Sequence, residues 1–276
     1  MLPFLGNLKI LEISNSILPK KLSFDSLPLL RKFLVYRPIL LEEIELSKPY
    51  LVELKCLDGR RDPVDLASDI NSPIKCNFSG APKLTSLSYM VPSVEMNVMF
   101  TDISQQNPEL RNLTVVILND WFNWTPIWTF SQVTHLKLRF FKPSYFSFVR
   151  AMAILKAFPN LRVFRLIMNC TEDLKEETEG GHDLSYVPKY LEDFSFSYFH
   201  CSKLQMQFAK YLLKYASALK KMSILIEPKK SEYYFAKGRY RRMTYWSAAN
   251  TLQKLDRRNI LDVQTSEEIT FGSFSL

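Results

Sequence analysis

Glycine, cysteine and long apolar runs are all scarce in this chain of 276 residues. Its 7 glycines form neither a G-x-G-x-x-G nor a G-K-S/T stretch, which argues against a backbone cradle for nucleotide phosphates. The 4 cysteines lie far apart without C-x-x-C spacing, which indicates a reducing compartment and no disulfide framework. No run approaches the roughly 20 apolar residues of a membrane span, and a signal-peptide pattern is missing. We therefore expect a cytoplasmic or nuclear protein with no membrane partner.

An enzyme requires a constellation of reacting side chains, and the sequence offers none. The histidines, His135, His182 and His200, are too scattered to form a metal site by spacing. His200 precedes Cys201, but adjacent residues on an extended chain point to opposite faces, which argues against a nucleophile and its base. We expect no enzymatic activity, no metal and no cofactor.

The chain does contain, many times over, a short strand pattern that is apolar at its first, fourth and sixth positions. One such unit cannot bury its own apolar side, so successive units must stack. The sequence therefore predicts an α/β fold: an irregular leucine-rich-repeat solenoid with a parallel strand ladder and with short helices and turns on the convex side. The pattern begins at Leu8, Leu30, Leu41, Leu51, Leu84, Leu110, Val133, Leu161, Leu191 and Leu219.

The segments between these strands vary in length and type. Prolines before many of the strands should end each return segment and start the next strand. Starts only about ten residues apart, around residue 41, leave no room for a helix, so extended segments are expected there. Weaker strands are predicted at 74–79 and 94–100, and helices at 148–158, 204–215 and 246–261, from their apolar spacing.

We divide the chain into four parts. Residues 1–170 form the repeat array and 171–184 an acidic surface loop. Residues 185–228 form a terminal strand-helix-strand unit, and 229–276 a basic, solvated extension. The aromatic run Trp121, Phe122, Trp124 and Trp128 is expected to pack on the convex side, with a partner anchor as the alternative.

The outward positions of the repeat strands carry the charges that a partner would meet. Glu42, Glu43 and Glu45 lie early in the array, and basic residues lie later, so the concave surface should pass from acidic to basic. Clustered arginine suits the recognition of carboxylates. We therefore predict a partner-binding patch for an acidic segment, formed by Lys137, Arg139, Arg162 and Arg165.

Several stretches resemble plant F-box proteins with leucine-rich repeats. APKLTSLSY at 81–89 and FPNLRVFRL at 158–166 resemble the proline-containing strand starts of that family. The strand LEDFSF at 191–196, followed by FAKYLLKYASALKKMSI at 208–224, is similar to the FBD unit that ends many such proteins. The resemblance covers about residues 8–226.

Membership would imply the substrate-recognition part of an SCF-type E3 ubiquitin ligase, with a protein substrate on the concave repeat face. A Skp1-like adaptor would bind only through an upstream F-box. Because no F-box precedes Leu8, we expect this chain to bind a substrate without recruiting the adaptor by that route. Two alternatives stay open: a leucine-rich-repeat fragment of an innate-immune receptor, and an RNA-binding protein that uses the basic, tyrosine-rich stretch at 229–242. The net charge of +8 alone does not indicate a nucleic-acid partner, since basic faces are usually solvated.

Overall fold

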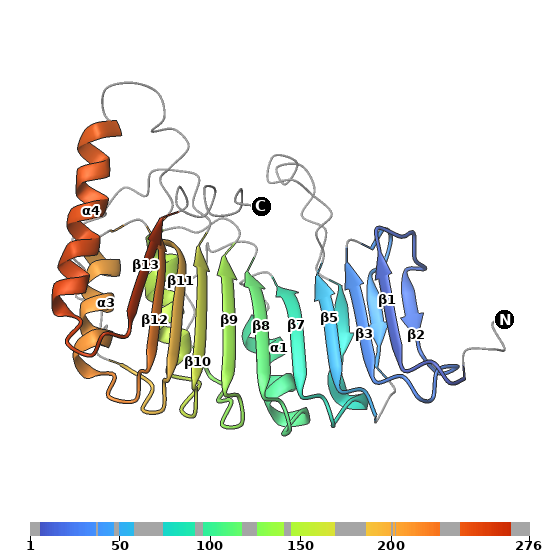
Figure 1. The fold of residues 1–276 in the computed structure, drawn as a ribbon. Helices are drawn as coiled ribbons and strands as arrows, with labels where there is room; N and C mark the ends of the chain where they lie inside the picture. The colour runs from blue at the N-terminus through green and yellow to red at the C-terminus, as the bar shows by residue number, and fades with distance from the viewer. Residues whose placement is uncertain are drawn as a thin grey trace. The chain divides into compact units, whose positions relative to one another are not determined.

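The chain is an α/β protein with a long sheet of parallel strands and few helices (Figure 1). The computed structural model describes residues 6–36, 38–46, 50–57, 74–91, 96–117, 126–140, 145–168, 186–199, 201, 203–226 and 238–265. The chain divides into two compact units, residues 1–136 and 137–276. The expected acidic loop at 171–184 lies outside the described residues.

The first unit contains a ladder of parallel strands whose register follows the repeat pattern. Fourth-position side chains share one row across the ladder, for example Leu54 beside Leu87, and sixth-position side chains share another, for example Cys56 beside Tyr89. From the second strand onward both rows are buried. The strands, in spatial order, are β1 (Ile10–Ser14), β3 (Lys32–Tyr36), β5 (Glu53–Leu57), β7 (Ser86–Val91) and β8 (Asn112–Ile117).

The second unit repeats this arrangement. Strand β9 (His135–Phe140) spans the division between the units, and its residues from Lys137 onward lie next to β10 (Val163–Met168). Strands β11 (Asp193–Phe199), β12 (Lys221–Ile226) and β13 (Leu261–Thr265) follow in parallel. The fourth-position row contains Phe164, Phe194, Met222 and Leu261.

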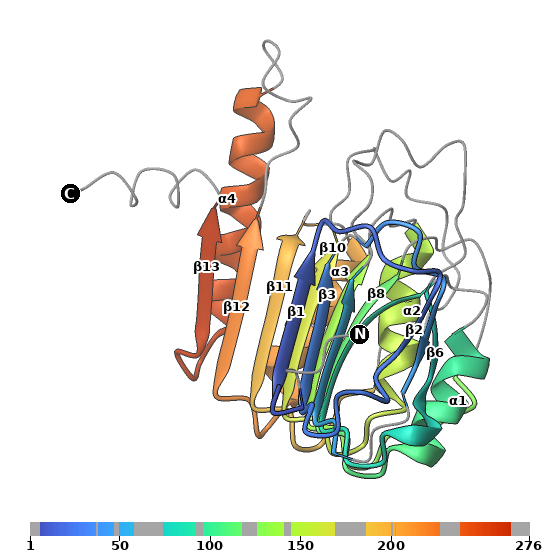
Figure 2. The ribbon, with the colours of Figure 1, turned by 90° about the vertical axis from the view of Figure 1, so that its right-hand side faces the viewer.

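Aromatic side chains fill the core of the second unit. The ring of Phe194 lies 5.5 Å from Phe164 and 5.8 Å from Phe208, and Phe148 stacks on Phe196 at 5.9 Å. Phe148 belongs to α2 (Tyr145–Leu155) and Phe208 to α3 (Lys203–Tyr215), which lie along the aromatic side of the strands (Figure 2). The helices predicted at 148–158 and 204–215 are therefore confirmed as α2 and α3.

The segment at 41–46 does not belong to the main ladder, so the prediction of one continuous ladder was wrong there. Its strand β4 (Glu43–Glu45) pairs with β2 (Lys21–Ser23) and β6 (Lys75–Asn77) in a second parallel sheet (Figure 2). The start at Leu41 follows Leu30 closely because β4 is the return segment of the repeat that begins with β3. The predicted extended return and the predicted strand at 74–79 are confirmed.

The predicted strand at 94–100 is instead the beginning of helix α1 (Met96–Gln106). Met96, Phe100 and Ile103 are buried, and this helical spacing outweighs the short alternation of apolar residues that suggested a strand. Trp128 packs against Phe100 at 4.9 Å, which confirms its predicted place in the packing. Of the aromatic run, Trp121, Phe122 and Trp124 lie outside the described residues.

Proline turns precede several strands, as the sequence predicts. In each case the N–H of a first-position leucine donates to the carbonyl three residues earlier, and proline occupies the second place of the turn. Its fixed φ suits that place, so the turn both ends the return segment and positions the next leucine. The bonded pairs are Leu30 with Leu27, Leu84 with Ala81, Leu110 with Asn107, and Leu161 with Phe158.

The extension at 229–276 is not merely solvated, because it contributes both α4 (Gly238–Leu255) and β13 to the fold. Leu252 of α4 is fully buried, and Leu261 pairs in register with Met222. The third predicted helix exists but ends at Leu255, since the chain must turn before β13. The sequence pattern missed this strand because Arg258 stands at the position where the other repeats have an apolar residue.

Arg258 replaces the packing of a leucine with hydrogen bonds. Its guanidinium donates to the carbonyls of Ala216 at 2.8 Å, Leu213 at 3.2 Å and Leu219 at 3.3 Å, at and beyond the end of α3. Carbonyls at a helix end lack intrahelical partners, and a cation there is also favoured by the helix dipole. The arginine thus ties the turn before β13 to the end of α3, the helix that precedes β12.

Replacing Arg258 should loosen the end of the sheet. Arg258→Met removes these donors, so we expect the free energy of local opening of β13 to fall by about 1 kcal/mol. Amide hydrogen exchange at Leu261 and Val263 measures it. Arg257→Met changes the neighbouring exposed arginine and should leave exchange unaltered. Equal exchange in both variants would show that the guanidinium does not hold the strand.

Candidate partner-binding face

The open face of each ladder carries the third, fifth and seventh positions of the strand pattern. In the second unit these positions lie opposite the aromatic core, because successive side chains on a strand alternate between faces. Lys137 and Arg139 occupy the fifth and seventh positions of β9, and Arg165 occupies the fifth position of β10. We call Lys137, Arg139 and Arg165 the basic cluster.

The charges of the basic cluster act on one another. The pKa of Lys137 is lowered, first by burial of its half-buried side chain and then by the positive charges of Arg139 and Arg165. In the part of the chain that the structure describes, no carboxylate forms an ion pair with Lys137 or Arg165. The cluster therefore concentrates positive charge on the open face, where an anion would stabilise the charged form of Lys137.

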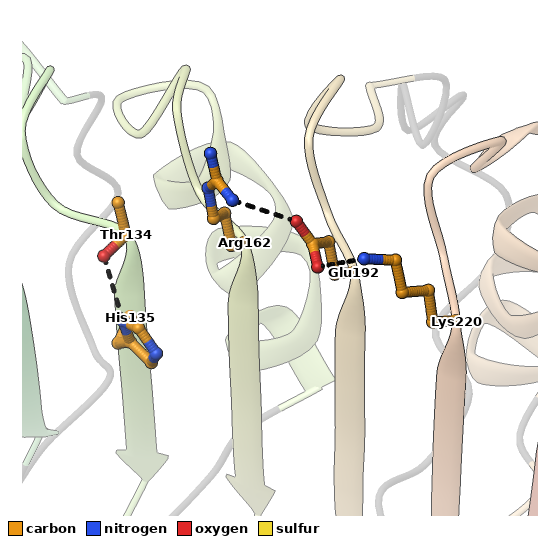
Figure 3. Close-up of polar contacts among 5 residues, drawn as sticks. All are labelled: Thr134, His135, Arg162, Glu192 and Lys220. Atoms are coloured by element: carbon orange, nitrogen blue, oxygen red, sulfur yellow. Dashed lines mark hydrogen bonds and ion pairs between the residues drawn. The ribbon is translucent and has the colours of Figure 1, made fainter.

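Arg162, the fourth residue of the predicted patch, is in a different position. It lies before β10, and its guanidinium is 3.1 Å from a carboxylate oxygen of Glu192, whose other oxygen is 2.7 Å from the Lys220 ammonium (Figure 3). The pKa of Glu192 is lowered, chiefly by the hydrogen bond from Lys220. Arg162 thus shares a carboxylate within the protein, and the basic cluster contains only the other three predicted residues.

The early acidic residues do not form the expected acidic part of this face. Glu43 and Glu45 lie on β4 of the second sheet and Glu42 directly precedes it, because the segment at 41–46 is a return strand. All three form ion pairs on that sheet: Lys20 with Glu42 at 2.8 Å, and Lys21 with Glu43 and Glu45, each at 3.3 Å. The predicted passage from acidic to basic therefore fails for these residues.

The open face of the first unit carries a balanced group of charges. Glu53 accepts from Lys32 and from Lys55, each at 2.9 Å. The pKa of Glu53 is lowered, chiefly by its hydrogen bond with Lys55, although burial opposes this change. Its charge is thus compensated within the ladder, in contrast to that of Lys137.

Two serines beside the basic cluster were missed by the sequence analysis. Ser195 is in register with Arg165, and Ser197 with Ile167, so both lie on the open face of β11. Both are half-buried. Their small size at the fifth and seventh positions was the available signal, but serine on a strand is too common to indicate a site without knowledge of its neighbours.

The described residues contain no assembled metal site. No group of three or more His, Cys, Asp or Glu among them is placed to hold a metal ion. His135 is exposed, with Nδ1 2.9 Å from the hydroxyl of Thr134 (Figure 3), whereas His182 and His200 lie outside the described residues. Burial raises the pKa of Cys201 to about 12, which keeps its thiol protonated at neutral pH.

Comparison with known proteins gave no relative. No family model, no curated protein and no solved structure matches the chain. Among the helices in the described ranges, none combines the length and apolar character needed to cross a bilayer.

Neutralising one arginine should change the titration of Lys137. Arg165→Gln removes a like charge from the cluster, so the protonated lysine is stabilised and its pKa rises toward the ordinary 10.5. A pH titration followed by the ¹³Cε chemical shift of Lys137 measures this. Arg162→Gln is the matched control and should cause a smaller rise, because Glu192 balances that arginine. Equal effects of the two variants would contradict the proposed grouping.

Glu53 should make stability depend on pH in the acid range. A lowered pKa in the folded state means that the carboxylate stabilises the fold above its unfolded pKa, and that this contribution disappears as the pH falls through the folded pKa. We expect Glu53→Gln to lower the free energy of unfolding by about 0.5–1 kcal/mol at pH 7 and by little at pH 2–3. Urea unfolding at both pH values tests this, and a constant difference would refute it.

Proposed function

We propose that the chain is a non-enzymatic leucine-rich-repeat solenoid whose open face binds an acidic segment of a protein partner. The observation that carries this proposal is the basic cluster, in which burial and like charge lower the pKa of Lys137 while Lys137 and Arg165 pair with no carboxylate of the described residues. The solenoid rests on the shared register of the fourth and sixth positions within each ladder.

An acidic partner suits this surface for physical reasons. The charged form of Lys137 is destabilised, because its side chain is half-buried and lies near two other cations. A carboxylate placed among these side chains would stabilise that charged form, and arginine can bind a carboxylate through two parallel N–H donors. The strands hold the three side chains on one face, so little order has to be created when the partner binds.

We further propose that this binding serves substrate recognition in an SCF-type E3 ubiquitin ligase. The support is the resemblance of the proline-led strands and of the strand-helix-strand unit at 185–228 to plant F-box proteins of the FBD type. In such an assembly the open face holds the substrate, and an F-box upstream of the repeat array binds the Skp1-like adaptor.

Charge reversal in the basic cluster should weaken the binding of an acidic probe. The probe is a fluorescein-labelled peptide of eight Glu and Asp residues. We expect Lys137→Glu/Arg165→Glu to lower the affinity for this peptide about tenfold or more, measured by fluorescence anisotropy. Lys83→Glu/Lys189→Glu changes the net charge equally at exposed turn positions, so it separates the local site from the overall field. Equal weakening in the two double variants would refute the site.

Two further measurements separate the alternatives. A single-stranded RNA oligonucleotide that binds more tightly than the peptide would favour the RNA-binding alternative. Co-expression of the complete gene product with a Skp1-like adaptor tests the ligase role, for which a stable complex is expected. If no complex forms, the ligase role is refuted, whereas the proposed binding face is not affected.

A further inference from the structure

Two cations, an apolar residue and a hydroxyl follow one another in and beside the short strand β2, at Lys20, Lys21, Leu22 and Ser23. Protein kinases select substrates partly by charge patterns, and paired cations before a hydroxyl are complementary to an acidic substrate groove. The same order recurs as KKMS at 220–223 and as RRMT at 241–244, whose side chains lie outside the described residues. Because the pattern recurs, the surroundings of each hydroxyl decide which one a kinase can reach.

The fold exposes Ser23 at the free edge of a sheet. Strand β2 pairs with β4 on one side, and no strand of the described residues pairs with its other side (Figure 1). The strand has 3 residues, and the side chain of Ser23 is exposed. A short strand with a single neighbour opens locally more easily than one inside a sheet. This segment can therefore leave the sheet and enter the extended substrate groove of a kinase.

The two lysines before Ser23 are accessible as well. Lys20 pairs with Glu42 at 2.8 Å, and Lys21 pairs with Glu43 and Glu45 at 3.3 Å each, with all five side chains solvent-exposed. Exposed ion pairs of this kind contribute little to stability. Carboxylates of a kinase can thus replace these glutamates at small cost.

Ser223 has the same pattern before it but the opposite surroundings. Strand β12 pairs with β11 on one side and with β13 on the other, so both of its edges are occupied. Ser223 is half-buried, and its neighbours Met222 and Ile224 are buried in the core. A kinase could bind this segment only after the end of the ladder had opened. The structure therefore favours Ser23 over Ser223.

We propose that Ser23 is a phosphorylation site for a serine/threonine kinase that prefers paired basic residues before the hydroxyl. The kinase transfers the γ-phosphoryl group of Mg²⁺-bound ATP to Oγ of Ser23. The Oγ–P bond forms, the bond between this phosphorus and the β–γ bridging oxygen breaks, ADP leaves, and the hydroxyl proton passes to a carboxylate of the kinase. This inference goes beyond the proposed function and does not depend on it.

The phosphate would alter the charge balance of the second sheet. Ser23 is the register partner of Glu45, and its hydroxyl donates to Oδ2 of Asp25 at 2.8 Å. A group with a charge of about −1.5 to −2 is therefore created beside two carboxylates. The ammonium of Lys21 is already shared between Glu43 and Glu45. Repulsion between like charges on neighbouring strands should then loosen β2 from β4.

Kinase treatment of the full chain tests the site. The catalytic subunit of cyclic-AMP-dependent protein kinase is added with Mg-ATP, and mass spectrometry follows the occupancy of each hydroxyl. We expect Ser23 to be modified about tenfold faster than Ser223 in the folded chain, and at similar rates in free peptides of residues 17–27 and 217–227. Lys20→Gln/Lys21→Gln should slow the modification of Ser23 about tenfold, whereas the control Lys83→Gln/Lys189→Gln, with the same change in net charge, should not.

Two results would overturn the site: absence of modification at Ser23, or equal modification of Ser23 and Ser223 in the folded chain. Amide hydrogen exchange then tests the loosening of the sheet. We expect the amides of 20–23 and 43–45 to exchange about threefold faster after phosphorylation, and no change in kinase-treated Ser23→Ala. Unchanged exchange in the phosphorylated chain would refute the effect on the sheet.

Discussion

The burial of two rows of apolar side chains, one at the fourth and one at the sixth position of each strand, is the constraint on which this protein depends. Because side chains alternate between the faces of a strand, a slip of one residue would turn a whole row outward. Register is therefore strongly specified wherever these rows are buried, as for Phe33, Leu54 and Leu87 in the first unit. The same constraint decides which side chains stand on the open face, and so it also places the basic cluster.

Once the two apolar rows are buried, the return segments can differ in length and in secondary structure. The first unit returns through the short strands β2, β4 and β6 and later through helix α1, whereas the described return segments of the second unit contain the helices α2, α3 and α4. Each return needs only to cover the apolar side and to reach the turn before the next strand. Even the first-position leucine can be exchanged, because Arg258 supplies hydrogen bonds to the end of α3 in place of apolar packing.

Charge compensation distinguishes the open faces of the two units. Glu53 is held between Lys32 and Lys55, so its charge is satisfied by neighbours on the ladder. Lys137 has arginines near it instead, and its charge is disfavoured by burial as well. Under the proposed function, an anionic partner placed among these cations would stabilise the charged form of Lys137. Arg162 differs, since Glu192 already balances its charge.

The sequence alone determined the features that depend on local patterns. The spacing of Leu84 and Leu87 predicts a strand, Pro82 predicts the turn before it, and the stripe through Phe148 and Met152 predicts a helix. These features could be predicted because propensity and periodicity act within about one turn or strand of the chain. The open-face positions of Lys137, Arg139 and Arg165 follow from the same alternation.

Only the tertiary structure decided which strands are neighbours. The pattern at 41–46 is the same as elsewhere, yet β4 pairs in a second sheet, and β13 joins the ladder without a leucine at its start. The Arg162 ion pair and the placing of Ser195 beside Arg165 are likewise contacts between strands some 30 residues apart. Such pairings depend on how each return segment closes its loop and covers the core, and no local periodicity encodes them.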